Sequence, residues 1–400
     1  MLKIKNILSI SIIFVLLFSL FSINGFSIDK IDNEIGEFST DEEFSYYNID
    51  STVWSELENH QEKVEMCQLD TEQLQTMSTE DLVSACLDYP LLIDMFAYNS
   101  VEEGFNALLN QSNAFYELTQ RSDAATKLLN TYDKCYIVTM EDFKTTSKEN
   151  TKELYNDMFE TNVVEALLSQ EVFINKLSNQ EKVSLARIAN KKLEQKLGES
   201  DVFSKSSISL STSILNNDSI SAVTTDDYYD GYFYFGNGIY GYYNKIVKTP
   251  RGSKVSALDV QQDFTSAEVR AYTALVGLSY PKVTLMNLPT IKYNCHSYAW
   301  HSTSGEYWIN DPTPYIRDGS YFRCIKKSGA KMIYKNDGQI DHSGIVDKFY
   351  QGPYKNSESE MITVKSKWGA LGLYNHSGLD CPYYLGSNTI IKCYSSADYK

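Results

Sequence analysis

The sequence predicts an α+β protein in which an N-terminal α-helical bundle is followed by a domain with an antiparallel sheet. Three observations lead to this fold class. The chain has 400 residues, more than the roughly 100–150 of a typical single domain. Its first half has helix caps and apolar residues at helical spacing, whereas its second half has short aromatic runs broken by glycine turns, which are typical of strands.

The expected organisation has five segments. In chain order they are a signal peptide (1–27), a flexible acidic lead-in (28–50), a helical domain (51–198), a Ser/Thr-rich linker (199–225) and an α+β domain (226–400).

The N-terminus has the pattern of a secretory signal peptide. Lys3 and Lys5 precede an uncharged stretch, and Gly25 and Ser27 supply the small residues of a cleavage site after Ser27. The alternative is an uncleaved anchor, because the apolar stretch approaches the length of a membrane span. Cleavage predicts a secreted or cell-wall-associated protein without stable membrane insertion. The codon-related bias toward Lys, Asn, Ile and Tyr suggests a bacterial source.

Serine caps mark three helix starts in the first half. Ser78, Ser100 and Ser178 each stand three residues before an acidic residue that can complete a capping box. Apolar residues then recur every three or four positions, and Gly198 follows the last of them as a stop signal. These signals predict a bundle of helices joined by short loops.

The linker and the second domain differ from the first half in composition. Residues 204–225 are dense in Ser, Thr, Asn and Asp and predict the linker. The aromatic runs around Gly236-Asn237-Gly238 predict a hairpin over 232–243, and Thr249 to Ser253 predicts a turn. A helix over 266–275 and a short strand over 284–286 are expected before the cysteine discussed next.

Cys295 is the candidate nucleophile. Asn294 is a good N-cap, which places Cys295 in the first turn of a short helix, where free N–H groups and the helix dipole favour a thiolate. The same N–H groups could form an oxyanion hole, with Tyr293 or the Asn294 amide as extra donors. His296 is a candidate substrate contact at the rim of this site or a packing residue.

His342 is the candidate base, because it precedes the apolar strand that begins at Gly344 and could face the thiol across a groove. A third polar residue is needed to orient it. The candidates are His376, then Ser366, then Asn375. Trp368 shares one strand face with Ser366 and could contact substrate.

Charge, metal and cysteine patterns limit the other functions. From Asp226 onward 19 basic residues stand against 16 acidic ones, or +3, so the part before Asp226 carries −19 to give the net charge of −16, and this acidic half argues against a nucleic-acid partner. No metal-ligand spacing or phosphate-binding loop is present, so no metal or cofactor is expected. Seven cysteines leave at least one thiol free, and Cys381 with Cys393 is the pair to test.

Cys381 is also a competing nucleophile. It stands before Pro382, where it could cap a helix with His342 upstream, in a circular permutation of the same site.

The segments Asn294 to Trp300, His342 to Val346, Ser366 to Gly369 and Asp380 to Tyr383 resemble a group of secreted proteins of Gram-positive bacteria. That group is similar to the NlpC-type and CHAP-like branches of the papain-like superfamily. The resemblance covers about residues 242–393. It implies a papain-like α+β fold and metal-free hydrolysis of peptide or amide bonds, with peptidoglycan or a peptide as substrate.

Two departures accompany the resemblance. Asn294-Cys295-His296-Ser297 replaces the common Asp-Cys-Ser/Thr-Gly signature, and His376 is farther from His342 than in the compact NlpC-type arrangement. The alternative function is therefore a secreted binding or structural protein with a degenerate papain-like domain. In either case the helical domain is a candidate to bind a protein or the cell wall.

Overall fold

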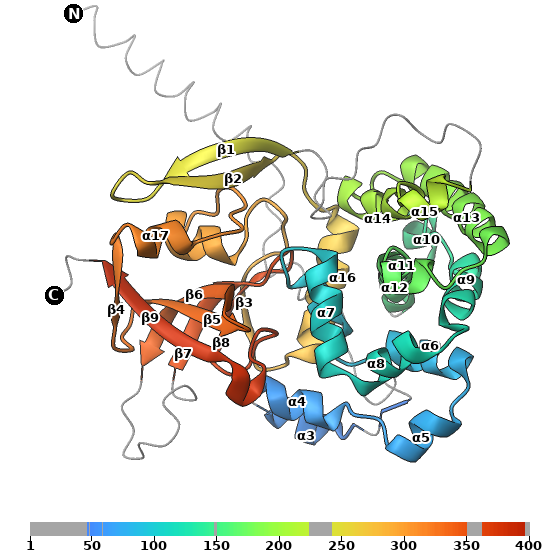
Figure 1. Cartoon of the computed structure of the whole chain (residues 1–400), viewed down its shortest axis with the longest axis horizontal. Coiled ribbons are helices and arrows are strands. Elements are labelled where there is room, and N and C mark those ends of the chain that lie inside the picture. Colours follow the sequence, from blue (N-terminus) through green and yellow to red (C-terminus); the bar gives the residue numbers. More distant parts are fainter. Residues whose placement is uncertain are drawn as a thin grey trace, which may run out of the picture. The chain divides into compact units, whose positions relative to one another are not determined.

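The computed structural model describes residues 46–47, 49–57, 59–147, 150–223, 242–349 and 362–396 (Figure 1). All of them belong to one compact unit, Glu37–Lys400. Helices and antiparallel sheets together give the predicted α+β class. The predicted signal peptide and most of the predicted lead-in lie outside the described residues.

The first half of the described chain is helical. Its elements are α3 (Ser51–Glu56), α4 (His60–Met66), α5 (Thr71–Thr76), α6 (Thr79–Leu87), η2 (Leu92–Phe96), α7 (Val101–Gln111), α8 (Asn113–Gln120), α9 (Ala124–Lys134), α10 (Met140–Thr145), α11 (Thr151–Leu168), α12 (Glu171–Ile174), α13 (Asn179–Gly198), α14 (Lys205–Leu215) and α15 (Asp218–Ser221). None of the described helices combines the length and the apolar character that a membrane crossing needs.

The three predicted serine caps are confirmed. Ser78, Ser100 and Ser178 accept hydrogen bonds from the backbone N–H groups three residues later, at the starts of α6, α7 and α13. At Ser178 the backbone N–H also donates to the Glu181 carboxylate at 2.8 Å, which completes the capping box. Gly198 is the last helical residue of α13 rather than the residue beyond its end.

The predicted linker is wrong over most of its length. Residues 205–215 and 218–221 form α14 and α15, and the apolar side chains of α14 are buried in the main core. The serines that suggested a linker form hydrogen bonds within the fold. Ser204 caps α14, and Ser211 donates to the buried Glu165 carboxylate at 2.7 Å. Hydroxyl groups that bond to buried carboxylates can lie inside a core at little cost, whereas unpaired ones lower the stability.

Glu165 of α11 is the centre of a buried polar cluster in the helical region. Its carboxylate accepts hydrogen bonds from Lys196 at 2.6 Å and from Tyr132 and Ser211 at 2.7 Å each. Lys196 also donates to the Asn162 side chain at 3.1 Å. The cluster therefore joins α9, α11, α13 and α14 at fixed positions.

The second half contains two antiparallel sheets, separated from the helical region by residues outside the description. Its elements are β1 (Tyr242–Lys248), β2 (Lys254–Val260), α16 (Ser266–Ser279), β3 (Thr284–Asn287), η3 (Ser297–His301), α17 (Thr313–Arg317), β4 (Tyr321–Cys324), β5 (Lys331–Asn336), β6 (Gln339–Phe349), β7 (Ile362–Lys367), β8 (Leu373–Ser377), η4 (Gly386–Asn388) and β9 (Ile390–Ser396).

The strands β1 and β2 form a separate ribbon, and β3 to β9 form one sheet in the order β3-β8-β7-β6-β5-β9-β4 (Figure 1). The predicted turn at 249–253 joins β1 to β2, and the predicted helix and strand appear as α16 and β3. The predicted hairpin over 232–243 lies outside the described residues, except that Tyr242 and Tyr243 begin β1.

The seven-stranded sheet has a core on each face. One face, which includes Tyr334, Val364 and Trp368, joins the core of the helical region. On the opposite face, Ile333 packs with Trp300 of η3 and with the β1–β2 ribbon. The site described below lies where η3 meets the strands β6 and β7.

The two halves are not separate domains, contrary to the sequence prediction. Trp54 of α3 donates from Nε1 to the Leu278 carbonyl at the end of α16 at 2.9 Å, and Lys63 of α4 pairs with Asp380 at 2.7 Å. Both partners of this ion pair are buried. A buried ion pair is costly to break, so it ties the helical region to the segment after β8.

Candidate functional site

Cys295 begins the short helical segment that continues into η3. The Asn294 side-chain oxygen accepts from the Ser297 N–H at 3.1 Å, and the Asn294 carbonyl accepts from the Tyr298 N–H at 3.0 Å. Asn294 is therefore the N-cap that the sequence predicted. The segment then widens into a π-helix, closed by a bond from the Ser302 N–H to the Ser297 carbonyl at 3.0 Å.

The Cys295 sulfur is buried among hydrogen-bond donors. Its side chain is only 1% exposed. Burial raises the pKa of the thiol to about 12, although the backbone N–H groups of Ser343, His296 and Cys295 itself and the charge of Lys367 all favour the thiolate. The donors that would stabilise a thiolate are present, but desolvation of the buried sulfur outweighs them.

Ser343, not His342, faces the helix of Cys295. The Ser343 hydroxyl accepts from the Trp300 indole N–H at 2.8 Å and lies 2.8 Å from Nδ1 of His296. Successive side chains of a strand point to opposite faces, so the neighbouring His342 side chain points to the other face of β6. The predicted strand entrance is also wrong, because β6 begins at Gln339 and His342 lies inside it, opposite Tyr334 of β5.

His342 is enclosed by aromatic rings. Its ring stacks on that of Tyr383, with centroids 3.7 Å apart and planes 8° from parallel. Neither ring nitrogen has a hydrogen-bond partner among the described residues, so no bond joins His342 to the Cys295 sulfur. Burial is the main cause that holds the pKa of His342 well below its ordinary value, and the ring is therefore neutral.

His376 and Ser366, two candidates for the third residue, are bonded to each other. Nδ1 of His376 lies 2.7 Å from the Ser377 carbonyl, which can only accept, so this nitrogen carries the proton. Nε2 then accepts from the Ser366 hydroxyl at 2.7 Å, and the Trp368 indole donates to the same hydroxyl at 3.1 Å. Burial lowers the pKa of His376 to about 4. Both nitrogens of His376 are occupied, and neither bonds to His342.

Lys367 places a buried amine near the thiol. Its Nζ donates to the carbonyls of Thr290 at 2.9 Å, Gly369 at 2.6 Å and Leu371, and it lies 5.2 Å from the ring centre of Tyr293. Three carbonyl acceptors use all three hydrogens of an ammonium group, which favours the charged form although burial lowers the pKa of Lys367 to about 7.

The other predicted residues take different positions. Asn375 donates to the Asp347 carboxylate at 3.1 Å. Cys381 opens no helix, since residues 381–383 form a bend and turn. Burial raises its pKa to about 12. Tyr293 packs against Gly305, and among the described residues its hydroxyl makes no hydrogen bond to the Cys295 sulfur, so its predicted role as a donor has no support in this geometry.

All seven cysteines are free thiols in the structure. Cys381 and Cys393, the pair that the sequence suggested, form no disulfide. Instead, strand register places Cys393 of β9 directly opposite Cys324 of β4.

The site is closed to solvent. Five cavities in the described part of the chain have no lining contribution from Cys295, His342 or His376. In the same part of the chain, no group of three or more His, Cys, Asp and Glu residues is arranged to hold a metal ion.

Sequence reasoning missed Ser343, Lys367 and Tyr383 as parts of the site. All three stand inside the segments that carried the resemblance, beside residues that were singled out. Strand alternation from a correct β6 start would have pointed to Ser343. No local signal indicates that Tyr383 stacks on His342.

Comparisons of the chain with protein-family models, curated proteins and solved structures return no match.

Proposed function

We propose that this chain is a secreted or cell-wall-associated cysteine hydrolase of the papain-like kind, with Cys295 as nucleophile. Its substrate class would be peptide or amide bonds, and peptidoglycan is the substrate that the sequence resemblance implies. No metal or cofactor takes part in the proposed reaction. The antiparallel sheet with a cysteine at the start of a packed helix is compatible with a papain-like domain.

One observation carries the proposal. Among the described residues, Nε2 of His296, next to the hydrogen-bonded thiol, has no partner, and neither nitrogen of His342, on the other face of β6, has one. A buried polar group that makes no hydrogen bond costs about 1–3 kcal/mol, and natural proteins keep few of them. Such a cost is understandable where the group must exchange protons or meet a substrate.

In the proposed reaction, the Cys295 sulfur bonds to the carbonyl carbon of an amide after its proton passes to a histidine. The carbon–nitrogen bond then breaks, and the amine leaves with that proton. Water hydrolyses the resulting thioester and regenerates the thiol. The backbone N–H groups of Ser343 and His296, which point to the sulfur, are near enough to the reacting centre to act as donors to the oxyanion.

Two histidines compete for the role of base. The sequence pattern favours His342, whereas His296 shares Ser343 with the thiol. Neither is hydrogen-bonded to the sulfur in the closed structure, so catalysis requires a rearrangement. Parallel His342→Ala and His296→Gln variants assign the role, because only loss of the base should lower the rate of acylation at pH 7.

The decisive experiment compares two buried cysteines. Cys295→Ala should abolish release of peptide fragments from purified peptidoglycan, while Cys381→Ala, the matched control, should retain it. Circular dichroism must show that both variants are folded. Continued hydrolysis by Cys295→Ala, or its loss only in Cys381→Ala, would reject Cys295 as the nucleophile.

A second function is favoured by the burial of the thiol. A cysteine that is 1% exposed, with its pKa raised to about 12, has the properties of an inert core residue. On this basis the chain would be a secreted binding or structural protein. Wild-type and Cys295→Ala protein would then cosediment equally with peptidoglycan, and neither would release fragments or react quickly with iodoacetamide near pH 6.

A further inference from the structure

A short segment of the helical region crosses to the candidate site. We call it the strap; it comprises Ala97, Tyr98 and Asn99, between η2 and α7. The Asn294 side chain donates to the Asn99 side-chain oxygen at 3.0 Å. The strap thereby contacts the residue that caps the helix of Cys295.

The strap also fixes the ring that covers His342. The Tyr383 hydroxyl donates to the Ala97 carbonyl, and the Tyr98 hydroxyl donates to the Pro382 carbonyl at 2.9 Å. The rings of Tyr98 and Tyr383 lie 5.0 Å apart. Because Tyr383 stacks directly on His342, these bonds hold the cover in place.

Gly369 allows the strap backbone to approach the sheet closely. It has a φ of +45°, and a Cβ at this position would lie 2.1 Å from the Ala97 carbonyl oxygen and 2.8 Å from that of Tyr98. The Ala370 N–H donates to the neighbouring Phe96 carbonyl at 3.1 Å. Any larger residue at 369 must therefore displace the strap or the turn after β7.

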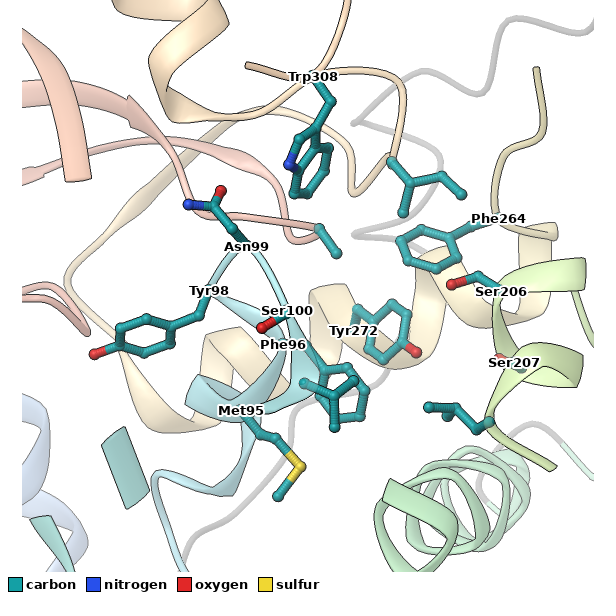
Figure 2. Close-up of a pocket in the computed structure, with 14 residues that line it drawn as sticks. Met95, Phe96, Tyr98, Asn99, Ser100, Ser206, Ser207, Phe264, Tyr272 and Trp308 are labelled. Carbon is teal, nitrogen blue, oxygen red and sulfur yellow. The ribbon is translucent and has the colours of Figure 1, made fainter. Parts of the chain in front are cut away.

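A cavity of about 50 Å³ lies against the strap (Figure 2). Tyr98 and Asn99 line it, and Phe264 and Trp308 line it from the second half of the chain. The indole N–H of Trp308 is buried and has no partner among the described residues. The strap is thus packed against a void on one side, which lowers the cost of moving it compared with a segment in a filled core.

We propose that the strap is an autoinhibitory element that keeps Cys295 and His342 covered, and that its displacement exposes the thiol. The inference deepens the proposed function, on which it rests for what the exposed thiol then does. It explains why the donors around Cys295 favour a thiolate while burial prevents one. Displacement would return solvent to the sulfur and let those donors lower its pKa.

Gly369→Ala in the full chain tests the strap by steric displacement. The matched control is Gly329→Ala, since Gly329 also has a positive φ but no atom of the described residues within 4 Å of its added Cβ. The readout is the rate at which iodoacetamide alkylates Cys295 at pH 8, located by peptide mass mapping. We expect Gly369→Ala to increase this rate by about tenfold or more and Gly329→Ala to leave it unchanged.

Two core thiols separate local opening from unfolding. Cys67 and Cys86 are fully buried in the helical region, so their alkylation reports loss of the whole fold. A rise at Cys295 alone supports the strap. A folded Gly369→Ala protein with an unchanged Cys295 rate overturns the proposal.

If Gly369→Ala unfolds the protein, Cys295, Cys67 and Cys86 will all react together, and a second variant is then needed to test the strap. Tyr98→Phe combined with Asn99→Ala removes two strap hydrogen bonds without adding atoms. Its control is Tyr47→Phe, which removes a similar hydroxyl bond to the Ala85 carbonyl (3.0 Å) elsewhere. A selective rise at Cys295 in the double variant supports the strap, and equal rates in variant and control overturn it.

The thiol assay does not depend on catalysis. If strap variants expose Cys295 but release nothing from peptidoglycan, the strap holds and the hydrolase proposal fails. If peptidoglycan hydrolysis requires Cys295 but strap variants change neither alkylation nor hydrolysis, the hydrolase proposal holds and the strap proposal fails.

Discussion

Two buried polar clusters in this chain differ in how completely their hydrogen bonds are made. Around Glu165, each carboxylate oxygen has donors, and Lys196 bonds to both a carboxylate and an amide. In the part of the chain that the structure describes, three nitrogens of His296 and His342 lack partners, although these side chains are no more exposed.

The difference separates polar groups that serve the fold from those that are candidates for chemistry. A satisfied cluster fixes the relative positions of helices, and any change to it leaves a partner unpaired. A cluster with unpaired nitrogens gives no comparable benefit to stability, so its retention needs another cause. Mutations in the two clusters should therefore have opposite consequences.

The largest effect is expected in the helical cluster. Glu165→Ala leaves the buried Lys196 ammonium without its counter-ion and should lower the free energy of unfolding by about 3–5 kcal/mol. Glu80→Ala is the control, because Glu80 pairs with Lys127 and Lys134 at the surface and its removal should cost less than about 1 kcal/mol. Urea denaturation followed by circular dichroism measures both, and equal losses would contradict the distinction.

Cys324 and Cys393 should be able to form a disulfide, whereas Cys295 should not. Directly opposite residues on antiparallel strands have Cα atoms about 4.5–5.5 Å apart, within the range of disulfides. Glutathione disulfide should therefore link Cys324 to Cys393 by thiol–disulfide exchange, with two glutathione thiols released, and leave Cys295 free. The bridge should raise the free energy of unfolding by about 3 kcal/mol.

Non-reducing peptide mapping identifies this bridge, and Cys324→Ser is its control. A bridge between Cys381 and Cys393, or none after complete oxidation, would contradict the strand register.

Local chemistry made part of this structure predictable. The caps at Ser78, Ser178 and Asn294 depend only on side chains that reach backbone groups three residues away, and all three are present. The same locality explains the failure at 199–225. A serine-rich stretch suits a solvated linker as well as a helix whose hydroxyl groups meet Glu165, and only tertiary contacts decide between them.

The face of a strand residue could not be predicted in the same way. His342 was placed before a strand because the apolar run begins at Gly344, but pairing with β5 extends β6 back to Gln339. That extension, together with the register shift near Tyr334, decides which side chains meet the helix of Cys295. The cover by the strap likewise depends on contacts between residues almost 300 positions apart, such as Ala97 and Tyr383.

Acid should reveal the neutral histidines of the site. Burial lowers the pKa of His296 to about 4, so between about pH 6.5 and 4 the unfolded chain binds a proton that the folded chain does not. The stability that this ring contributes is present above pH 6.5 and is lost as the pH falls. The slope is about 1.4 kcal/mol per pH unit.

His296→Gln removes this titration. Relative to its own stability at pH 7.5, the variant should lose about 2 kcal/mol less than wild type on going to pH 5. Urea denaturation at the two pH values measures the difference, and parallel losses would show that His296 is not buried as a neutral ring.

The smallest change in stability distinguishes the two clusters most sharply. His342→Phe keeps a ring for stacking on Tyr383 and removes two unpaired nitrogens, so the free energy of unfolding should stay constant or rise by about 1 kcal/mol. His376→Phe is the matched control, because it leaves Ser366 and the Ser377 carbonyl without their partner and should lower that free energy by about 1–3 kcal/mol. If His342 is the base, the stable His342→Phe protein will lose hydrolysis. A clear loss of stability would instead show that His342, like Glu165, is a polar group that stabilises the fold.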